Sequence, residues 1–237
     1  MLLCLFAFTG IPLSAGAQTS AVNEWTWMGG SSTLNCIDNS CAQPGPGVTL
    51  EIPAPGVYGT LGTPAAGNIP GGRYEATSWT DRSGNLWLFG GQGSDANGNI
   101  GYLNDLWKFN PATNQWAWMD GSSTLLVITN GVFGQPGVYG TLATPAAENT
   151  PGGRYEATSW TDSSGNLWLF GGYGFDANGN YNYLNDLWKF NPVTNEWAWM
   201  GGNSIADDNS GVYGSLGTPA AGNIPGGRYE ATSWTDR

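Results

Sequence analysis

One eleven-residue string occurs three times in the chain and constrains its fold more than any other feature. The string GGRYEATSWTD begins at Gly71, at Gly152 and again at Gly226. The residues from Gly56 to Ser123 also align without a gap with the residues that begin at Gly137. Because copies this similar adopt the same structure, the sequence predicts repeated supersecondary units that pack against one another.

Each unit contains four short runs that have the composition of β-strands. In the first unit these runs, a to d, are residues 74–80 (YEATSWT), 86–89 (LWLF), 105–109 (DLWKF) and 115–119 (QWAWM). The runs are rich in aromatic residues, and Ser-Gly-Asn and Asn-Pro-Ala-Thr-Asn turns lie between a and b and between c and d. Run b is apolar on both faces, so we expect a four-stranded antiparallel meander that is covered on both sides.

Repeating such a meander around an axis buries both of its faces, which is the architecture of a β-propeller. The units resemble Kelch repeats, in which an apolar strand ends in a Gly pair and an aromatic residue precedes a Trp by seven positions. The residues that carry this resemblance are Gly90-Gly91 with Phe109 and Trp116, and Gly171-Gly172 with Phe190 and Trp197. The family usually has Tyr where Phe109 and Phe190 stand. The repeat here also exceeds roughly 50 residues because a Pro/Gly-rich insertion separates d from the next a. The resemblance implies an all-β fold, a partial β-propeller of Kelch-type blades.

The repeat divides the chain into two complete blades with flanking single strands. The expected divisions are a signal peptide (1–17), a strand d with a long Cys-containing loop (18–72), a blade (73–120), an inter-blade loop (121–153), a second blade (154–201), and a loop with the first strand of a further blade (202–237). Propellers usually close with four to eight blades. We therefore expect a C-terminally truncated piece of a longer protein.

The N-terminus predicts export. Residues 2–8 form an apolar run, and residues 15–17 (AGA) offer a cleavage site with small side chains, although no basic residue precedes the run. The run is too short to span a membrane, and a buried strand is the alternative interpretation. An exported chain is secreted, periplasmic or held at the cell surface, where Cys36 and Cys41 are expected to form a local disulfide.

The charge and the missing residue types exclude several classes of function. The net charge is −11 with only seven Lys and Arg, which argues against nucleic-acid partners and anionic membranes. The sequence contains no His, so it offers no Ser-His-Asp triad and no His-ligated metal. Copper oxidases that resemble galactose oxidase need such ligands. We expect no cofactor or metal, and a non-catalytic module is favoured over a fragment of a carbohydrate-active oxidase or sugar isomerase, or a purely structural surface repeat.

Strand direction predicts where a ligand would bind. In an antiparallel meander the long b–c and d–a loops share one face, and the two units differ mainly there. Aromatic side chains beside amides and carboxylates suit a protein or carbohydrate ligand, although they also suit packing within the loop itself. The candidate residues are Tyr173, Phe175, Asp176, Asn178, Tyr181, Tyr183, Asp95 and Asn97.

Two further patterns have competing interpretations. The repeated string DANGN, at 95–99 and 176–180, resembles the start of a calcium loop, but an Asn-Gly hairpin turn explains it equally well. An Arg opens each run a and a Glu follows two residues later, so these ions would line a central channel if run a is innermost. We favour structural ion pairs over catalysis for this set: Arg73, Glu75, Arg154, Glu156, Arg228 and Glu230.

Overall fold

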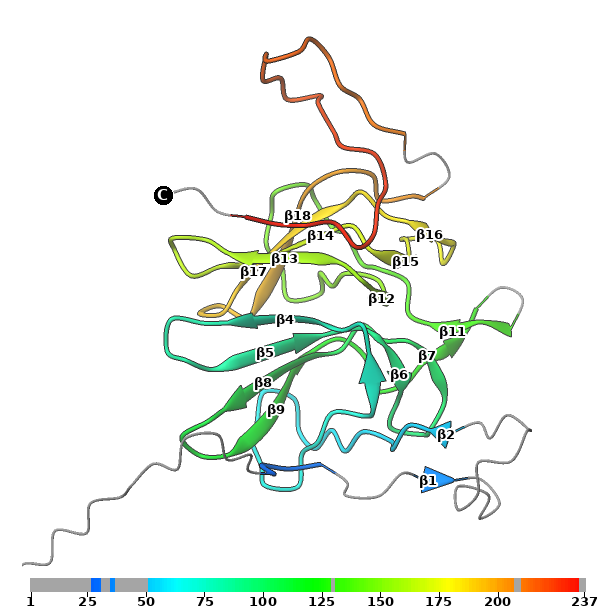
Figure 1. Cartoon of the computed structure of the whole chain (residues 1–237), viewed down its shortest axis with the longest axis vertical. Coiled ribbons are helices and arrows are strands. Elements are labelled where there is room, and N and C mark those ends of the chain that lie inside the picture. The colour runs from blue at the N-terminus through cyan, green and yellow to red at the C-terminus, as the bar shows by residue number, and fades with distance from the viewer. Residues whose placement is uncertain (1–26, 31–34, 37–50, 129–130, 207–209, 235–237) are drawn as a thin grey trace, which may run out of the picture.

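The structure is a computed structural model of the whole chain, and it describes residues 27–30, 35–36, 51–128, 131–206 and 210–234 (Figure 1). Every regular element in these ranges is a β-strand, which confirms the all-β prediction. No described segment forms a helix with the length and apolarity that crossing a membrane requires. The expected signal peptide and Cys41 lie outside the described residues, so export and the disulfide stay predictions.

Two four-stranded sheets form the centres of the two blades. The first has the order β4 (Thr77–Thr80), β5 (Leu86–Phe89), β8 (Leu106–Asn110) and β9 (Gln115–Asp120). The second has the order β13 (Thr158–Thr161), β14 (Leu167–Phe170), β17 (Leu187–Asn191) and β18 (Glu196–Gly201). All neighbours are antiparallel, so the predicted meander of runs a to d is confirmed.

Each blade has a second sheet, in which two strands of the expected b–c loop join the residues that begin run a. In the first blade this sheet is β3 (Arg73–Tyr74), β6 (Gln92–Ser94) and β7 (Ile100–Tyr102). In the second it is β12 (Arg154–Tyr155), β15 (Tyr173–Phe175) and β16 (Tyr181–Tyr183). Run a is therefore broken in two at Glu75, whose φ is 55°. Strand b turns into the second sheet at Gly91, where a Cβ would lie 2.7 Å from the Tyr74 carbonyl oxygen.

The Pro/Gly-rich insertion covers the outer edge of the blade that follows it. The Gly62 and Ala65 N–H groups donate to the carbonyl oxygens of Trp118 and Trp116 on β9, at 2.7 and 3.2 Å. The corresponding part of the second insertion lies along β18 in the same way. These bonds satisfy an edge strand that would otherwise pair with other chains. Residues 62–68 and 143–149 therefore lie along the outer edge, away from the b–c hairpins. The first part of each d–a loop does lie beside a b–c hairpin, as expected: the Ala96 and Ala177 N–H groups donate to the carbonyl oxygens of Ser123 and Ser204, each at 2.9 Å.

Smaller hairpins complete the described elements. β10 (Leu126–Val127) pairs with β11 (Phe133–Gly134), and β11 lies against β7 (Figure 1). Near the N-terminus, the backbones of β1 (Asn35–Cys36) and β2 (Glu51–Ile52) pair antiparallel.

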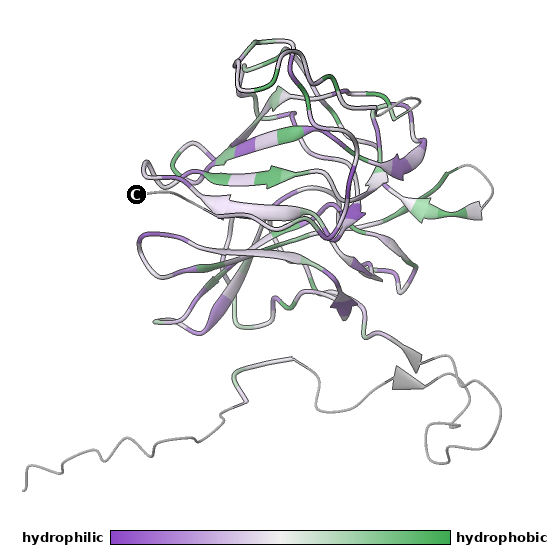
Figure 2. Cartoon of the chain, turned by 45° about the horizontal axis from the view of Figure 1, so that its top comes forward, coloured by the Kyte–Doolittle hydropathy of each residue, from purple (hydrophilic) through white to green (hydrophobic). Residues whose placement is uncertain are grey.

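The two blades pack face to face. The same four-residue sequence, LWLF, is buried on opposite faces in the two blades. In the LWLF of β5, Trp87 and Phe89 are buried and Leu86 is exposed, whereas in the LWLF of β14 the two Leu residues are buried. The Phe89 ring lies 5.6 Å from the Trp197 ring across the blade interface. In Figure 2 hydrophobic residues occur within the strands of the stacked sheets and also in several loops. One face of the first blade thus meets the opposite face of the second, as in a propeller.

The run a strands of successive blades lie side by side. β4 and β13 are neighbours in Figure 1, and the Ser159 hydroxyl donates to the Ser78 carbonyl oxygen at 3.3 Å. The third copy of run a, predicted as a strand, forms no strand among its described residues, but it lies in the same row, because the Ser233 hydroxyl donates to the Ser159 carbonyl oxygen at 2.7 Å. Run a is therefore the inner strand of each blade, which places the residues around it nearest the propeller axis.

Candidate functional site

The Arg residues that open run a are held inside the blades by Asp side chains. The Arg154 guanidinium donates from Nη1 and Nη2 to the two carboxylate oxygens of Asp186, at 2.6 and 2.8 Å. Asp186 also accepts hydrogen bonds from the Tyr139 hydroxyl at 2.6 Å and from Trp188 Nε1 at 2.7 Å. The side chains of both ions are fully buried. Burial and the Asp186 carboxylate raise the pKa of Tyr139 well above its usual value, so it stays a donor.

The first blade has the same hydrogen-bonded network, which we call the hub: an Asp carboxylate that accepts from an Arg, a Tyr and a Trp. Arg73 donates to both oxygens of Asp105 at 2.6 and 2.7 Å, and Tyr58 and Trp107 donate to the same carboxylate at 2.6 Å. Arg73 and Arg154 thus form structural ion pairs, the interpretation favoured above, but their partners are Asp residues rather than the nearby Glu, and both side chains are buried instead of lining a channel. Each Arg instead ties its blade to the preceding insertion through the shared Asp.

The Glu residues of run a form a column that crosses from blade to blade. The Glu156 N–H donates to the Glu75 carbonyl oxygen at 3.1 Å, and the Glu230 N–H donates to the Glu156 carbonyl oxygen at 3.1 Å. Each of the three has a positive φ of 53–55°. Burial and the neighbouring carboxylates of Glu75 and Glu230 raise the pKa of Glu156 to about 7. We call these residues the glutamate column.

Tyrosine side chains gather beside the glutamate column on the three-stranded sheet of the second blade. Tyr173 pairs directly with Tyr155 on one side and with Tyr183 on the other. Tyr102 of the first blade stacks on Tyr155 at 5.6 Å, and Tyr229 stacks on Tyr183 at 5.2 Å. The exposed fractions are 37% for Tyr181, 45% for Tyr183 and 41% for Tyr229. We call this surface the tyrosine face, which consists of Tyr102, Tyr155, Tyr173, Tyr181, Tyr183 and Tyr229.

The structure divides the sequence-predicted binding residues into two groups. Tyr173, Tyr181 and Tyr183 lie together on the tyrosine face. Phe175 is fully buried instead, and a Cβ on Gly134 would come within 1.9 Å of its ring. Our expectation of an exposed Phe175 is therefore wrong, because β11 covers this side chain and the hairpin rests on it.

The Asp residues of the DANGN strings are turn-forming groups. Asp176 Oδ1 accepts the N–H groups of Asn178 and Asn180 at 2.8 and 2.9 Å, and its Oδ2 accepts the N–H of Ala206 at 2.8 Å. Asp95 makes the same bonds with Asn97, Asn99 and Leu125 in the first blade. The Asn-Gly hairpin turn is thus the alternative that forms. No cluster of three metal-ligating acids or thiols occurs in the part of the chain that the structure describes.

Sequence reasoning missed three members of the tyrosine face, namely Tyr102, Tyr155 and Tyr229. Tyr155 and Tyr229 belong to the repeated RYE string and were assigned to a continuous inner strand. The alternation of a buried Arg with a Tyr on the opposite face is the signal that would have found them, because successive side chains of a strand point to opposite faces.

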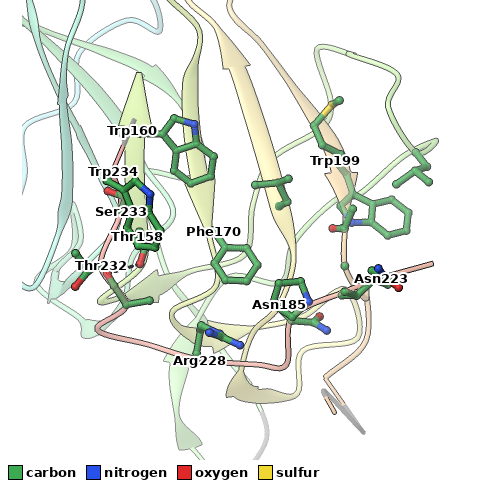
Figure 3. A pocket seen from close by; sticks show the side chains of 18 of the residues that line it. Thr158, Trp160, Phe170, Asn185, Trp199, Asn223, Arg228, Thr232, Ser233 and Trp234 are labelled. Atoms are coloured by element: carbon green, nitrogen blue, oxygen red, sulfur yellow. Dashed lines mark hydrogen bonds between the residues drawn. The ribbon is translucent and has the colours of Figure 1, made fainter. Parts of the chain in front are cut away.

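A cavity of about 640 Å³ lies on the outer face of the second blade. Figure 3 shows Trp160, Phe170 and Trp199 around it, with Arg228 at one end. The residues that correspond to Trp160 and Phe170 in the first blade, Trp79 and Phe89, are buried against the second blade. The cavity therefore has the lining of a blade–blade interface, and we assign it to packing between blades rather than to a small ligand.

The raised pKa of Glu156 leads to a pH-dependent prediction. The native state holds a proton that the unfolded state releases between about pH 4.5 and 7, so this residue lowers stability as the pH rises through that window. We expect Glu156→Gln to raise the melting temperature by a few degrees at pH 8 and to leave it unchanged at pH 4. Glu148→Gln, at an exposed position of the second insertion, is the control. An equal effect of Glu156→Gln at both pH values would contradict this account.

Comparison with known proteins finds a family motif in the second blade. The Kelch motif matches residues 163–198, which include strands b and c of the second blade and the start of strand d. A solved structure titled "Structure of YjhT" is 21% identical, with a TM-score of 0.39, and the alignment covers 58% of this chain. The chain spans only 40% of that structure's length. No curated protein matches the sequence.

Proposed function

Because the chain is built from Kelch-type β-propeller blades, we propose that it is an exported, non-catalytic binding module for a protein or glycan. The observation that supports this most is the tyrosine face. Tyr side chains offer large and rigid contact areas, with a polar hydroxyl, at a low cost in conformational entropy. Export rests on the apolar run and cleavage site near the N-terminus of the sequence.

Rigid support of the tyrosine face favours binding as its role. Arg154 precedes Tyr155 on β12, and its ion pair with Asp186 fixes that strand inside the blade. Phe175 packs beneath the hairpin that carries Tyr173 and Tyr181. A scaffold that holds its contact residues in place loses less entropy when a ligand binds. Both described ion pairs are satisfied within the blades, so they serve the fold.

The test is a double substitution on the tyrosine face. Glycan and protein arrays first identify ligands of the wild-type chain, and Tyr181→Ala with Tyr183→Ala is then expected to weaken binding at least tenfold. Truncating two central aromatic contacts typically costs more than about 1 kcal/mol each. The melting temperature should fall by only a few degrees, because more than a third of each side chain is exposed.

Tyr213→Ala is the matched control for this pair. Tyr213 is 73% exposed and lies outside the three-stranded sheets. Its substitution should leave binding unchanged. Normal binding by a folded Tyr181→Ala, Tyr183→Ala variant would place the ligand site elsewhere and sink the proposed function.

A further inference from the structure

The glutamate column lies directly beside the tyrosine face. Glu156 follows Tyr155, and Glu230 follows Tyr229, so each carboxylate starts next to a ring of the face. Burial, the neighbouring Tyr102 and then the carboxylates of Glu156 and Glu75 raise the pKa of Tyr155 to about 12. The Glu156 and Glu75 carboxylates therefore lie near the Tyr155 hydroxyl, close enough to raise its pKa.

No described basic residue forms an ion pair with the glutamate column. Arg73 and Arg154 are buried against Asp105 and Asp186. Lys108 lies over the ring of Trp87 and Lys189 over that of Trp168, at 5.3 and 5.9 Å, both on the four-stranded sheets. Arg228 is exposed and its Nε donates to the Gly226 carbonyl oxygen at 3.0 Å, and Arg82 is exposed in the turn between runs a and b.

Like charges brought together without a counterion favour a cation at the same place. The faces of tyrosine rings attract ammonium and guanidinium groups as well, by about 0.5–2 kcal/mol each. The surface thus offers two independent attractions to a basic side chain. A neutral sugar would use the rings and leave the carboxylates unpaired, which lowers the complementarity of such a ligand.

We propose that the tyrosine face binds a polypeptide segment carrying Lys or Arg side chains, whose charged ends reach the glutamate column while their stems pack on the rings. This inference rests on the proposed function, because it names the chemistry of the ligand for the same surface. The long apolar stem and terminal charge of Lys and Arg suit a surface on which tyrosine rings adjoin carboxylates.

The experiment uses labelled decapeptides of alternating Lys and Gly, of Glu and Gly, and of Ser and Gly. Fluorescence anisotropy with the full chain should show binding of the Lys peptide alone, weakened at least tenfold between 50 and 500 mM NaCl. Glu156→Gln should weaken this binding about three- to tenfold. Glu148→Gln removes the same charge away from the column and should have less than a twofold effect.

The variants distinguish the possible failures. Equal effects of Glu156→Gln and Glu148→Gln, or no binding of the Lys peptide, would overturn the basic-ligand proposal. A neutral glycan or acidic protein from the arrays that depends on Tyr181 and Tyr183 but not on Glu156 would also overturn it, yet would leave the proposed function intact. Binding that survives loss of both tyrosines would defeat the proposed function itself. The Glu156 variant remains interpretable because its substitution is expected to stabilise the fold near neutral pH.

Discussion

Replacing Asp186 by Ala is expected to destabilise the second blade by about 3–5 kcal/mol, enough to unfold much of it. The substitution leaves the Arg154 guanidinium buried without its counterion and removes the acceptor of Tyr139 and Trp188. The loss should appear as a lower urea midpoint in tryptophan fluorescence. Far-UV circular dichroism at 37 °C should show reduced strand content.

Tyr139→Phe is the control for the hub. It removes one hydrogen bond to Asp186 and keeps the ring that packs on Trp188 at 4.8 Å. We expect a cost of about 1 kcal/mol, with some addition for the acceptor left partly unsatisfied. Should Asp186→Ala cost no more than Tyr139→Phe, the carboxylate would not be the centre of this network.

The second large effect is expected at the interface between the blades. Phe89→Ala should cost about 3–5 kcal/mol, because Phe89 is fully buried and its truncation leaves a cavity against Trp197. Phe170 occupies the corresponding position of the second blade but is only half-buried. Phe170→Ala should therefore cost less than half as much.

Urea unfolding of the two Phe variants makes a direct comparison, since the substitutions and their local sequences are identical. Phe89→Ala should lower the midpoint clearly more than Phe170→Ala does. Similar midpoints for both would mean that the first blade does not pack on the second as described. The comparison thus tests the blade stacking without any assumption about a ligand.

The four-stranded sheets could be predicted because each strand and the turns beside it are recognisable from a few adjacent residues. The run 86–89 is apolar throughout and lies between turn residues, and its copy at 167–170 repeats both features. The repeat then extends any correct assignment from one blade to the next. The inner position of run a was left open by the sequence, and the hydrogen bonds between successive copies of run a establish it.

The second sheets could not be read from local pattern. Residues 92–94 are Gln-Gly-Ser, a sequence with low strand propensity. They form β6 because β3, which is separated from β4 by the break at Glu75, pairs with them. Phe175 has the sequence context of a loop, and only the approach of Gly134 on β11 buries it. Both outcomes depend on contacts between segments distant in sequence. The sequence thus indicated three tyrosines of the candidate site but not which neighbouring side chain was buried.

The tie between each insertion and the blade after it has a consequence for protein engineering. Tyr58 and Asp105 share a buried hydrogen bond, and residues 62–68 cap β9 of the same blade. A cassette that keeps this tie in the first blade therefore runs from residue 56 to 120, whereas one for the second blade must begin early enough to include β11, which covers Phe175. A recombination joint at residue 72 would leave the outer strand β9 unpaired along its edge. It would also leave the buried Asp105 carboxylate without the hydrogen bond from Tyr58. A joint at residue 55 would instead transfer the first blade together with the insertion that covers its outer edge.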